Sequence, residues 1–215
     1  MKMSDYYPVF VSLRDRLVIL VGGGPVARRK ARMLLRHGAR IRVIAPNVDE
    51  ELLRLADEGA IEVLQREYVD GNLEGAFLVF IATDDPTVNE AAYRECRRRG
   101  ILVNTVDEPR LSDFISASIL ARGDLQIAVS TSGACPRLAR RIREHLDDEF
   151  GPEYKTYLEV LGEARTEVIH SNLTESEKRD LIDALLDSNI LDLILGGKVD
   201  EARAEVKRIL RDSRQ

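Results

Sequence analysis

Short apolar runs recur along the first half of the chain, and most are followed by a segment in which apolar positions have helical spacing. The clearest runs lie at 17–21 and 77–82, and weaker ones at 40–45, 61–64 and 101–103. A continuous apolar run flanked by glycine or turn residues is typical of a strand buried on both faces. Strands that alternate with helices predict an α/β fold with a doubly wound parallel sheet.

Three glycines follow the first apolar run. The spacing Gly22-x-Gly24-x-x-Ala27, with Gly23 between, is the alanine-ended form of the dinucleotide-binding fingerprint. Glycine allows a tight turn and a close backbone approach, and Pro25 suits the first position of a helix. The free N–H groups of that helix can bind a pyrophosphate. We therefore predict a Rossmann-like nucleotide-binding domain, with an ordinary strand-to-helix turn as the alternative.

The pattern changes after residue 112. Two β-prone runs, 114–121 and 125–130, are joined by a turn at 122–124 and predict a β-hairpin. A lone hairpin is marginally stable in water, so it must pack on a second subunit or on the C-terminal helices.

Helical spacing dominates the rest of the chain. In the helix predicted over 136–150, we expect Leu138, Ile142 and Leu146 to face inward. The last helix is predicted at 199–210. The chain thus divides into a nucleotide-binding domain at 1–112, a dimerisation hairpin and helix at 113–150, and a helical C-terminal domain at 151–215.

Composition narrows the class of protein. The chain is 44% hydrophobic and 32% charged, and its net charge of −5 disfavours a general nucleic-acid binder. It lacks both an apolar run long enough to cross a bilayer and the layout of a secretory signal, so we expect a cytoplasmic protein without membrane association. The two cysteines and three histidines show no metal-ligand spacing, so no metal site is predicted.

The end of the second predicted strand bears on cofactor choice. An acidic residue about 20 residues after the glycines commonly binds the ribose hydroxyls of NAD. Here the strand runs into Pro46 and Asn47 without a carboxylate, whereas Arg40 and Arg42 leave a contact to a 2′-phosphate open. Spacing alone therefore does not distinguish NAD from NADP.

Polar residues follow the strand at 77–82. Thr83 and Asp84 come directly after it, and Asp85 and Pro86 follow them. Polar side chains at the carboxyl ends of parallel strands line the ligand crevice, which makes this tip a candidate cofactor contact. Capping of the next helix is an equally good interpretation.

Two later segments carry candidate chemistry. Asp107 follows the fifth predicted strand and could act as a general base in a cleft, although the local sequence favours a turn aspartate. Ser130 and Thr131 lie in a hydroxyl-rich loop before a helix that carries Arg137 and Arg140. Such a loop can bind a carboxylate or phosphate, and helix capping with solvated arginines is the alternative.

Several short motifs, each present once, follow one another over roughly the first 145 residues. They consist of Tyr7, Pro8, Val9, Phe10, Leu13 and Arg14; Val21 to Ala27 with Arg29, Lys30 and Ala31; Ala82 to Asp85 with Val88 and Asn89; Asn104, Val106, Asp107 and Pro109; Ser112 to Ser118; and Ala128, Val129, Ser130, Gly133, Pro136 and Leu138 to Arg140. Together they resemble the precorrin-2 dehydrogenase and sirohydrochlorin ferrochelatase family of siroheme biosynthesis.

The resemblance implies a homodimeric enzyme that oxidises precorrin-2 to sirohydrochlorin with NAD as hydride acceptor. Some family members also insert ferrous iron, so ferrous or cobalt ion is a further candidate substrate. The family's catalytic aspartate falls on Asp107. Its NAD contacts fall near Pro25 and Val26, and near Pro46 and Asn47.

Substrate charge gives the basic residues a role under this resemblance. Precorrin-2 is fringed with carboxylates, so an acidic protein needs a local basic surface to bind it. Arg110, Arg137, Arg140 and Arg141 are the candidates. Two alternatives are an NAD-binding regulatory module without turnover, and a chelatase or tetrapyrrole carrier that performs no oxidation.

Overall fold

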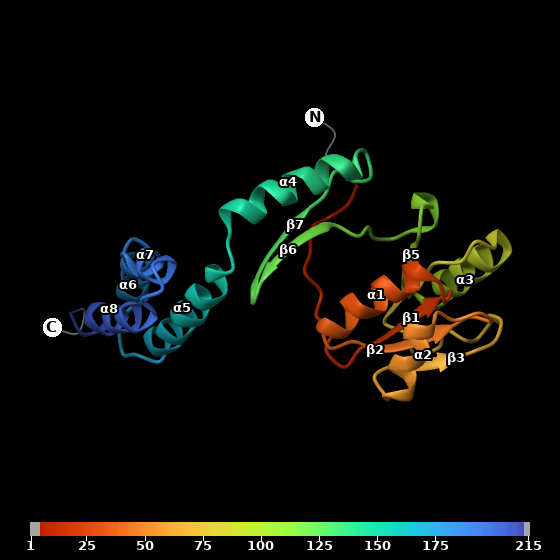
Figure 1. Ribbon diagram of the computed structural model, residues 1–215, viewed down its shortest axis with the longest axis horizontal. Helices are drawn as coiled ribbons and strands as arrows, with labels where there is room; N and C mark the ends of the chain where they lie inside the picture. The colour runs from red at the N-terminus through yellow and green to blue at the C-terminus, as the bar shows by residue number, and fades with distance from the viewer. Residues whose placement is uncertain (1–4, 213–215) are drawn as a thin grey trace. The chain divides into compact units, whose positions relative to one another are not determined.

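The computed structural model describes residues 5–212, and the chain forms two compact units, Met1–Ser116 and Ala117–Gln215. The first unit is a five-stranded parallel sheet with helices on its faces (Figure 1). Its elements are β1 (Leu17–Val21), α1 (Pro25–Arg36), β2 (Arg40–Ile44), α2 (Glu50–Asp57), β3 (Glu62–Leu64), β4 (Leu78–Ile81), α3 (Pro86–Arg99), β5 (Leu102–Thr105) and the 3-10 helix η1 (Pro109–Leu111). The strand order β3-β2-β1-β4-β5 confirms the predicted doubly wound sheet.

The two faces of the central strands build two separate apolar clusters. In β1, Val18 and Leu20 pack with Leu34 of α1 and Leu52 of α2. Ile19 of the same strand packs in a cluster on the other face, with residues of α3. Successive side chains of a strand point to opposite faces, so burial on both sides requires an unbroken apolar run. This is why the apolar pattern located these strands.

The segment before β1 is irregular. Its moderately apolar sequence leaves an irregular strand beside the sheet possible, but residues 5–13 contain no strand. Tyr7 and Phe10 are 85% and 70% exposed, so this part of the segment leaves large apolar side chains in solvent.

A buried lysine fastens the end of the first unit to its sheet. Nζ of Lys30, on the inner face of α1, donates to Ser116 Oγ at 3.1 Å and lies 4.1 Å from the centre of the Phe80 ring. Phe114 packs edge-on against the same ring at 5.3 Å. Burial, with a smaller contribution from Arg29, lowers the pKa of Lys30 to about 8.

The second unit begins with a hairpin and ends in a helical bundle. Its elements are β6 (Ser118–Arg122), β7 (Leu125–Val129), α4 (Pro136–Glu149), α5 (Glu153–Ile169), α6 (Glu175–Leu186), α7 (Ile190–Leu195) and α8 (Val199–Asp212). The predicted hairpin is confirmed, and α4 packs along it (Figure 1). Its first strand starts at Ser118 rather than residue 114, because Phe114 and Ser116 are held by the first unit.

The buried face of α4 is not the predicted one. Leu138 and Ile142 were expected to face inward, but they are 49% and 40% exposed, whereas Ala139 is buried. Asp147 of α4 accepts a 2.7 Å hydrogen bond from Arg122 of β6. Arg143, one turn earlier on the same face, also pairs with Asp147. Leu146, the third residue expected to face inward, is half-buried. The pairing of Arg122 with Asp147 therefore joins the hairpin to the side of α4 that carries Ala139 and Leu146.

The buried ammonium of Lys30 predicts a pH-dependent stability. Between pH 8 and its ordinary pKa of 10.5, the unfolded chain binds more protons at this group than the folded chain, so the folded state gains stability as pH rises. Below about pH 8 the folded wild type bears the full free-energy cost of burying the charged ammonium of Lys30. Lys30→Met removes this cost. Its stability relative to wild type should therefore fall by about 2 kcal/mol between about pH 7 and about pH 9.5.

Urea unfolding of both proteins at the two pH values measures this difference. Lys207→Met is the control, because Lys207 is exposed on α8 and its replacement should give a difference independent of pH. A pH-independent difference for Lys30→Met would show that burial does not depress the ionisation of Lys30.

Candidate functional site

The carboxyl ends of β1, β2, β4 and β5 lie at one edge of the sheet because all four strands are parallel. The strand order changes direction between β1 and β4, which is where open α/β sheets form their ligand crevice. The loops at this edge contain the glycines 22–24 and the predicted residues around 46–47, 83–84 and 107–110. The fold thus brings all predicted site residues of the first unit to the same edge.

The glycine turn is held against two neighbouring loops. Gly22 has a φ of +118°, and a Cβ there would lie 2.2 Å from the carbonyl oxygen of Ala82. A Cβ on Gly23 would lie 2.3 Å from the carbonyl oxygen of Asn47. Both positions therefore require glycine for steric reasons within the protein itself.

Gly24 differs from the two glycines before it. A Cβ at this position would meet no atom within 4 Å, and the backbone φ of −84° suits any residue. Gly24 is the N-cap of α1, and no side chain caps this helix. Pro25 follows at the first helical position. The open space and the uncapped N–H groups make the start of α1 a fitting cradle for an anion such as a pyrophosphate.

The loop after β2 places a carboxylate that the sequence analysis did not single out. The backbone N–H of Asp49 donates to Gly23 O at 2.9 Å, so Asp49 adjoins the glycine turn. Its side chain caps α2 by accepting from Glu51 N at 3.0 Å, and it also pairs with Arg28 at 3.0 Å. Dinucleotide-binding folds commonly carry such an acid at the end of the second strand, which is Pro46 and Asn47 here, whereas Asp49 follows two residues later.

The two arginines of β2 are not placed for the 2′-phosphate contact that the sequence left open. Arg40 opens the strand, in register with Leu17, and therefore lies at the amino end of the sheet. Arg42 lies in the middle of β2 and pairs with Glu62 of β3 at 2.7 Å. The structure therefore does not favour this contact, because strand direction puts Arg40 at the far edge and an ion pair occupies Arg42.

The tip of β4 combines capping with free polar groups. Asp85 accepts from Thr87 N at 2.8 Å and Val88 N at 3.3 Å, so it caps α3 as the alternative interpretation proposed. Thr83 donates to Asn89 Oδ1 at 2.7 Å. Asp84 is exposed and forms no hydrogen bond or ion pair within the described residues.

Asp107 lies at the top of a loop that folds back on β5. Its φ is +60°, a left-handed conformation that few residues other than glycine adopt and that aspartate tolerates better than most. The loop is closed by Ser112, whose hydroxyl accepts from Thr105 N at 2.9 Å and lies 3.0 Å from Glu108 O. The Asp107 carboxylate is exposed, and no partner binds it among residues 5–212. The loop therefore fixes the backbone and leaves the acid available.

A pocket adjoins this loop. It has a volume of about 470 Å³ and is lined by Pro86, Asn89, Glu90, Glu108, Arg110 and Leu111. Arg110 is exposed there and forms no ion pair with any described residue. The first unit thus offers a cavity with one unpaired cation next to the Asp107 loop.

The predicted anion site of the second unit is partly used by local capping. Ser130 Oγ accepts from Ser132 N at 3.0 Å, and Thr131 Oγ1 accepts from Cys135 N at 3.0 Å. Arg140 pairs with Glu144 at 2.8 Å. Arg137 and Arg141 are exposed, and within the described part of the chain neither has an ion-pair partner. These two arginines are the free cations of α4.

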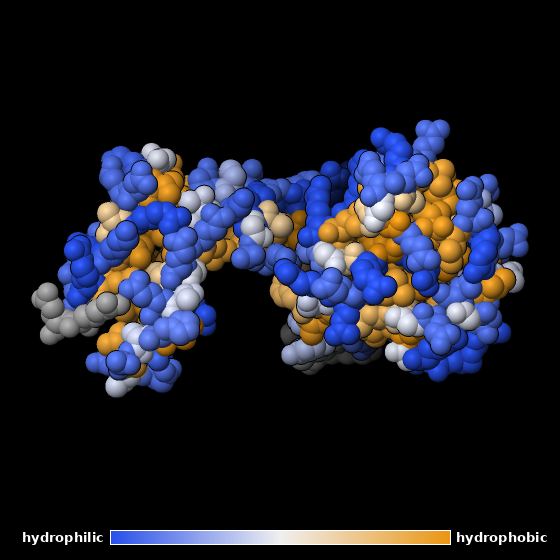
Figure 2. Space-filling model, turned by 90° about the horizontal axis from the view of Figure 1, so that it is seen from below, coloured by the Kyte–Doolittle hydropathy of each residue, from blue (hydrophilic) through white to orange (hydrophobic). Residues whose placement is uncertain are grey.

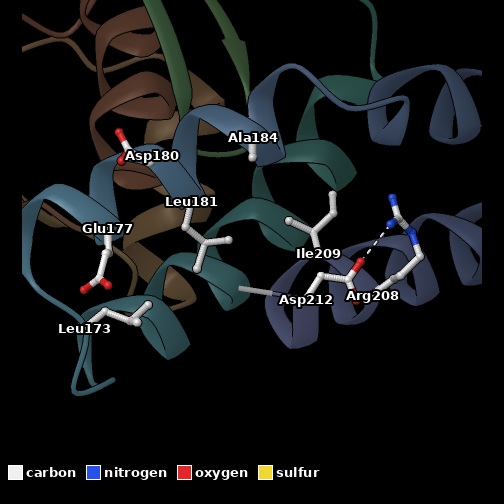
Figure 3. Close-up of a pocket in the computed structure, with 8 residues that line it drawn as sticks. All are labelled: Leu173, Glu177, Asp180, Leu181, Ala184, Arg208, Ile209 and Asp212. Atoms are coloured by element: carbon white, nitrogen blue, oxygen red, sulfur yellow. Dashed lines mark hydrogen bonds and ion pairs between the residues drawn. The ribbon is translucent and has the colours of Figure 1, made fainter. Parts of the chain in front are cut away.

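Another pocket, of about 380 Å³, lies between α6 and α8. Leu181 and Ile209 line it from the two helices, and Arg208 is paired there with Asp212 at 2.9 Å (Figure 3). Glu177 and Asp180 also line it, so three acids surround its one arginine, and that arginine is already paired. The pocket at Arg110 has two acids, of which Glu90 pairs with Arg94, and its arginine is unpaired. A ligand rich in carboxylates is therefore disfavoured more strongly between α6 and α8.

No group of three or more His, Cys, Asp or Glu side chains among residues 5–212 is arranged to hold a metal ion. No helix there has the length and apolar character needed to cross a membrane.

Comparisons with known proteins agree with this geometry. A family described as "Putative NAD(P)-binding" matches residues 9–118, which is more than half of the chain. A second, "Sirohaem biosynthesis protein central", matches residues 122–149. A solved structure titled "SirC, precorrin-2 dehydrogenase" superposes with a TM-score of 0.79 at 28% sequence identity, covering 94% of this chain and 100% of that one.

Curated relatives are longer than this chain. Siroheme synthase of Photorhabdus laumondii is 37% identical over 97% of this chain and 44% of its own length. Siroheme synthase of Pseudomonas aeruginosa strain PAO1 is 39% identical over 92% of this chain and 43% of its own length. The chain therefore spans less than half the length of these relatives.

Two alanine substitutions in the glycine turn should change the free energy of unfolding by very different amounts. Gly22→Ala forces a side chain into the carbonyl oxygen of Ala82 and into a left-handed backbone, and should lower the free energy of unfolding by about 2 kcal/mol or more. Gly24→Ala meets open space, and its effect should stay within about 0.5 kcal/mol. Urea unfolding measures both, and equal effects would contradict the assigned packing.

Proposed function

This chain belongs to the NAD(P)-binding family that includes the siroheme synthase N-terminal domain and the precorrin-2 dehydrogenase SirC, and we propose that it oxidises precorrin-2 to sirohydrochlorin with NAD as hydride acceptor. The observation that carries the proposal is the shared edge of the sheet, where the uncapped start of α1 and the exposed Asp107 both lie. An anion cradle and a free acid are what such an oxidation requires of the protein.

The residues at this edge fit a dinucleotide. Gly24 leaves room for a close approach, and the first N–H groups of α1, from Val26 onward, suit the pyrophosphate. Pro46 and Asn47 lie at the end of β2, where doubly wound folds bind the adenosine ribose. Thr83 and Asp84 would line the crevice from β4. When bound, the cofactor supplies the acceptor for the hydride.

Asp107 is the proposed proton acceptor. Oxidation of precorrin-2 removes a hydride and a proton, and the carboxylate of Asp107 takes the proton or orients the ring. The hydrogen bonds of Ser112 with Thr105 and Glu108 support this role, since they fix the loop and leave the Asp107 carboxylate without a partner in the described residues. A residue in a sparsely populated conformation that the surrounding bonds enforce is typical of functional positions.

Substrate binding is assigned to unpaired cations. Arg110 lies on the 470 Å³ pocket of the first unit, and Arg137 lies on α4 of the second. Both can form charge-assisted hydrogen bonds with carboxylates without first breaking an ion pair. Arg140 would exchange its partner Glu144 for the substrate, and Ser130 and Thr131 would add hydroxyl contacts.

A direct assay separates this proposal from its alternatives. The purified chain is mixed with precorrin-2 and NAD, and sirohydrochlorin absorbance and NADH are followed together. Matched formation of both products supports the dehydrogenase. Cofactor binding without turnover would indicate a regulatory module, and tetrapyrrole binding without NADH would indicate a carrier or chelatase. Adding ferrous or cobalt ion afterwards tests metal insertion separately.

Removing the charge of Asp107 should stop the chemistry without disturbing the loop. Asparagine also tolerates the left-handed conformation, so Asp107→Asn should fold normally and bind NAD while its kcat falls by about 100-fold. Steady-state kinetics with a separate NAD titration measures both quantities. Asp148→Asn, an exposed acid of α4, is the control, and an unchanged kcat for Asp107→Asn would remove this residue from the mechanism.

We also propose that the chain forms a homodimer through the hairpin and α4. Ile119 of β6 is 41% exposed, and Leu138 and Ile142 of α4 are likewise uncovered. Hydrophobic residues also reach the surface in other parts of the molecule, among hydrophilic ones, on the face seen in Figure 2. A hairpin that leaves such side chains in water gains stability by pairing with a second copy.

The dimer proposal predicts a charge-sensitive association. Ile142→Glu should convert the protein to a monomer at micromolar concentration, as measured by size-exclusion chromatography with light scattering, because a buried unpaired carboxylate is costly. Ile169→Glu on α5 is the matched control and should leave the mass unchanged. A monomeric wild type would overturn the proposal.

A further inference from the structure

Four charged side chains join α1 to α2 beside the glycine turn. Arg28 Nη1 lies 3.0 Å from Asp49 Oδ2, and Arg28 Nε lies 3.9 Å from Glu51 Oε2. Arg32 closes the set through an ion pair with Glu51. The carboxylate side chains are only 18% exposed, whereas Arg28 and Arg32 are 40% and 61% exposed. The two acids thus lie inside the cluster and the guanidinium groups partly cover them.

Backbone contacts place this cluster at the adenosine end of the proposed cofactor site. Asp49 N donates to Gly23 O at 2.9 Å. Gly23 also lies so close to Asn47 and Val48 that a Cβ would meet their backbone atoms at 2.3 and 3.0 Å. Asp49 therefore adjoins both the turn proposed for the pyrophosphate and the end of β2, where the adenosine ribose lies in this type of fold.

Two carboxylates and two guanidinium groups give the cluster a net charge of zero. This cluster should interact differently with a ribose that carries a 2′-phosphate and with one that carries free hydroxyl groups. A 2′-phosphate carries about two negative charges near neutral pH, and it would meet two carboxylates and an Arg28 that is already paired. An unmodified ribose presents hydroxyl groups, which can donate to a carboxylate. The same side chains therefore repel one ligand and accept the other, which is how specificity is commonly achieved.

We propose that Asp49 and Glu51, held by Arg28 and Arg32, make the cofactor site selective for NAD over NADP. This inference rests on the proposed function, because it assumes a dinucleotide at the carboxyl edge of the sheet. The end of β2 lacks the acid that commonly binds the ribose, and the inference assigns this role to Asp49, the N-cap of α2, and to Glu51 in its first turn. Arg28 becomes a ligand for the 2′-phosphate only when its two acidic partners are neutralised.

The test is a double variant, Asp49→Asn with Glu51→Gln, in the full chain. Asparagine caps a helix as well as aspartate does, so α2 keeps its N-cap while the cluster changes from balanced to a charge of +2. Isothermal titration calorimetry gives the Kd for NAD and for NADP without requiring turnover. The ratio of Kd for NADP to Kd for NAD should fall by about tenfold or more, the effect of one charge-assisted hydrogen bond.

Two further variants sharpen the result. Adding Arg28→Met to the double variant should restore most of the original ratio, since it removes the cation that receives the phosphate. Glu62→Gln is the matched control, because it also frees an arginine, Arg42, but in the middle of the sheet, and it should leave the ratio unchanged. Thermal unfolding checks that each variant folds, and Asp49→Asn alone is the milder substitute if the double variant does not.

The outcomes separate this inference from the proposed function. A wild type that binds NAD, with a ratio that the double variant or its substitute leaves unchanged, overturns the selectivity and leaves the cofactor site intact. A wild type that prefers NADP also overturns the selectivity. A wild type that binds neither dinucleotide overturns the proposed function and the selectivity together.

Discussion

The first unit depends on one steric constraint, the close approach of the β1 turn to the loops that follow β2 and β4. A side chain at Gly22 would meet Ala82 at 2.2 Å, and one at Gly23 would meet Asn47 at 2.3 Å. Only glycine lets three parallel strands end so close together and lets α1 start directly above them. The open N-terminus of α1 follows from this packing, since the same turn places Gly24 facing free space.

The loop after β5 also has a fixed backbone, and it leaves the side chain of Asp107 free. Ser112 and Thr105 form hydrogen bonds that close the loop, and the left-handed Asp107 lies at its top without an internal partner. A carboxylate held this way is spared the reorganisation that a mobile loop would require. The two features lie at one edge because parallel strands share a direction, so the sheet topology itself assembles the proposed site.

The second unit leaves part of an apolar pattern uncovered. The apolar positions of α4 predict that Leu138 and Ile142 are buried, yet in the single chain both are exposed, and the hairpin contacts α4 through Arg122 and Asp147. The exposed apolar residues and the free arginines of α4 are thus available for the proposed contacts with a second copy and with the substrate, respectively.

The sequence by itself determined the central buried strands, the glycine turn, the hairpin and the helices, because burial on both faces, steric demand for glycine and helical spacing are local properties of the chain. Its position after the fifth strand made Asp107 a candidate, the family resemblance gave it the catalytic role, and the structure placed it on an exposed loop at the predicted edge of the sheet. Only the tertiary structure decided that Arg40 lies at the wrong end of β2, that α4 turns Ala139 inward, and that Asp49 adjoins Gly23. Each of these three features depends on which distant segment packs against the residue. The spacing of residues along the chain does not specify that contact.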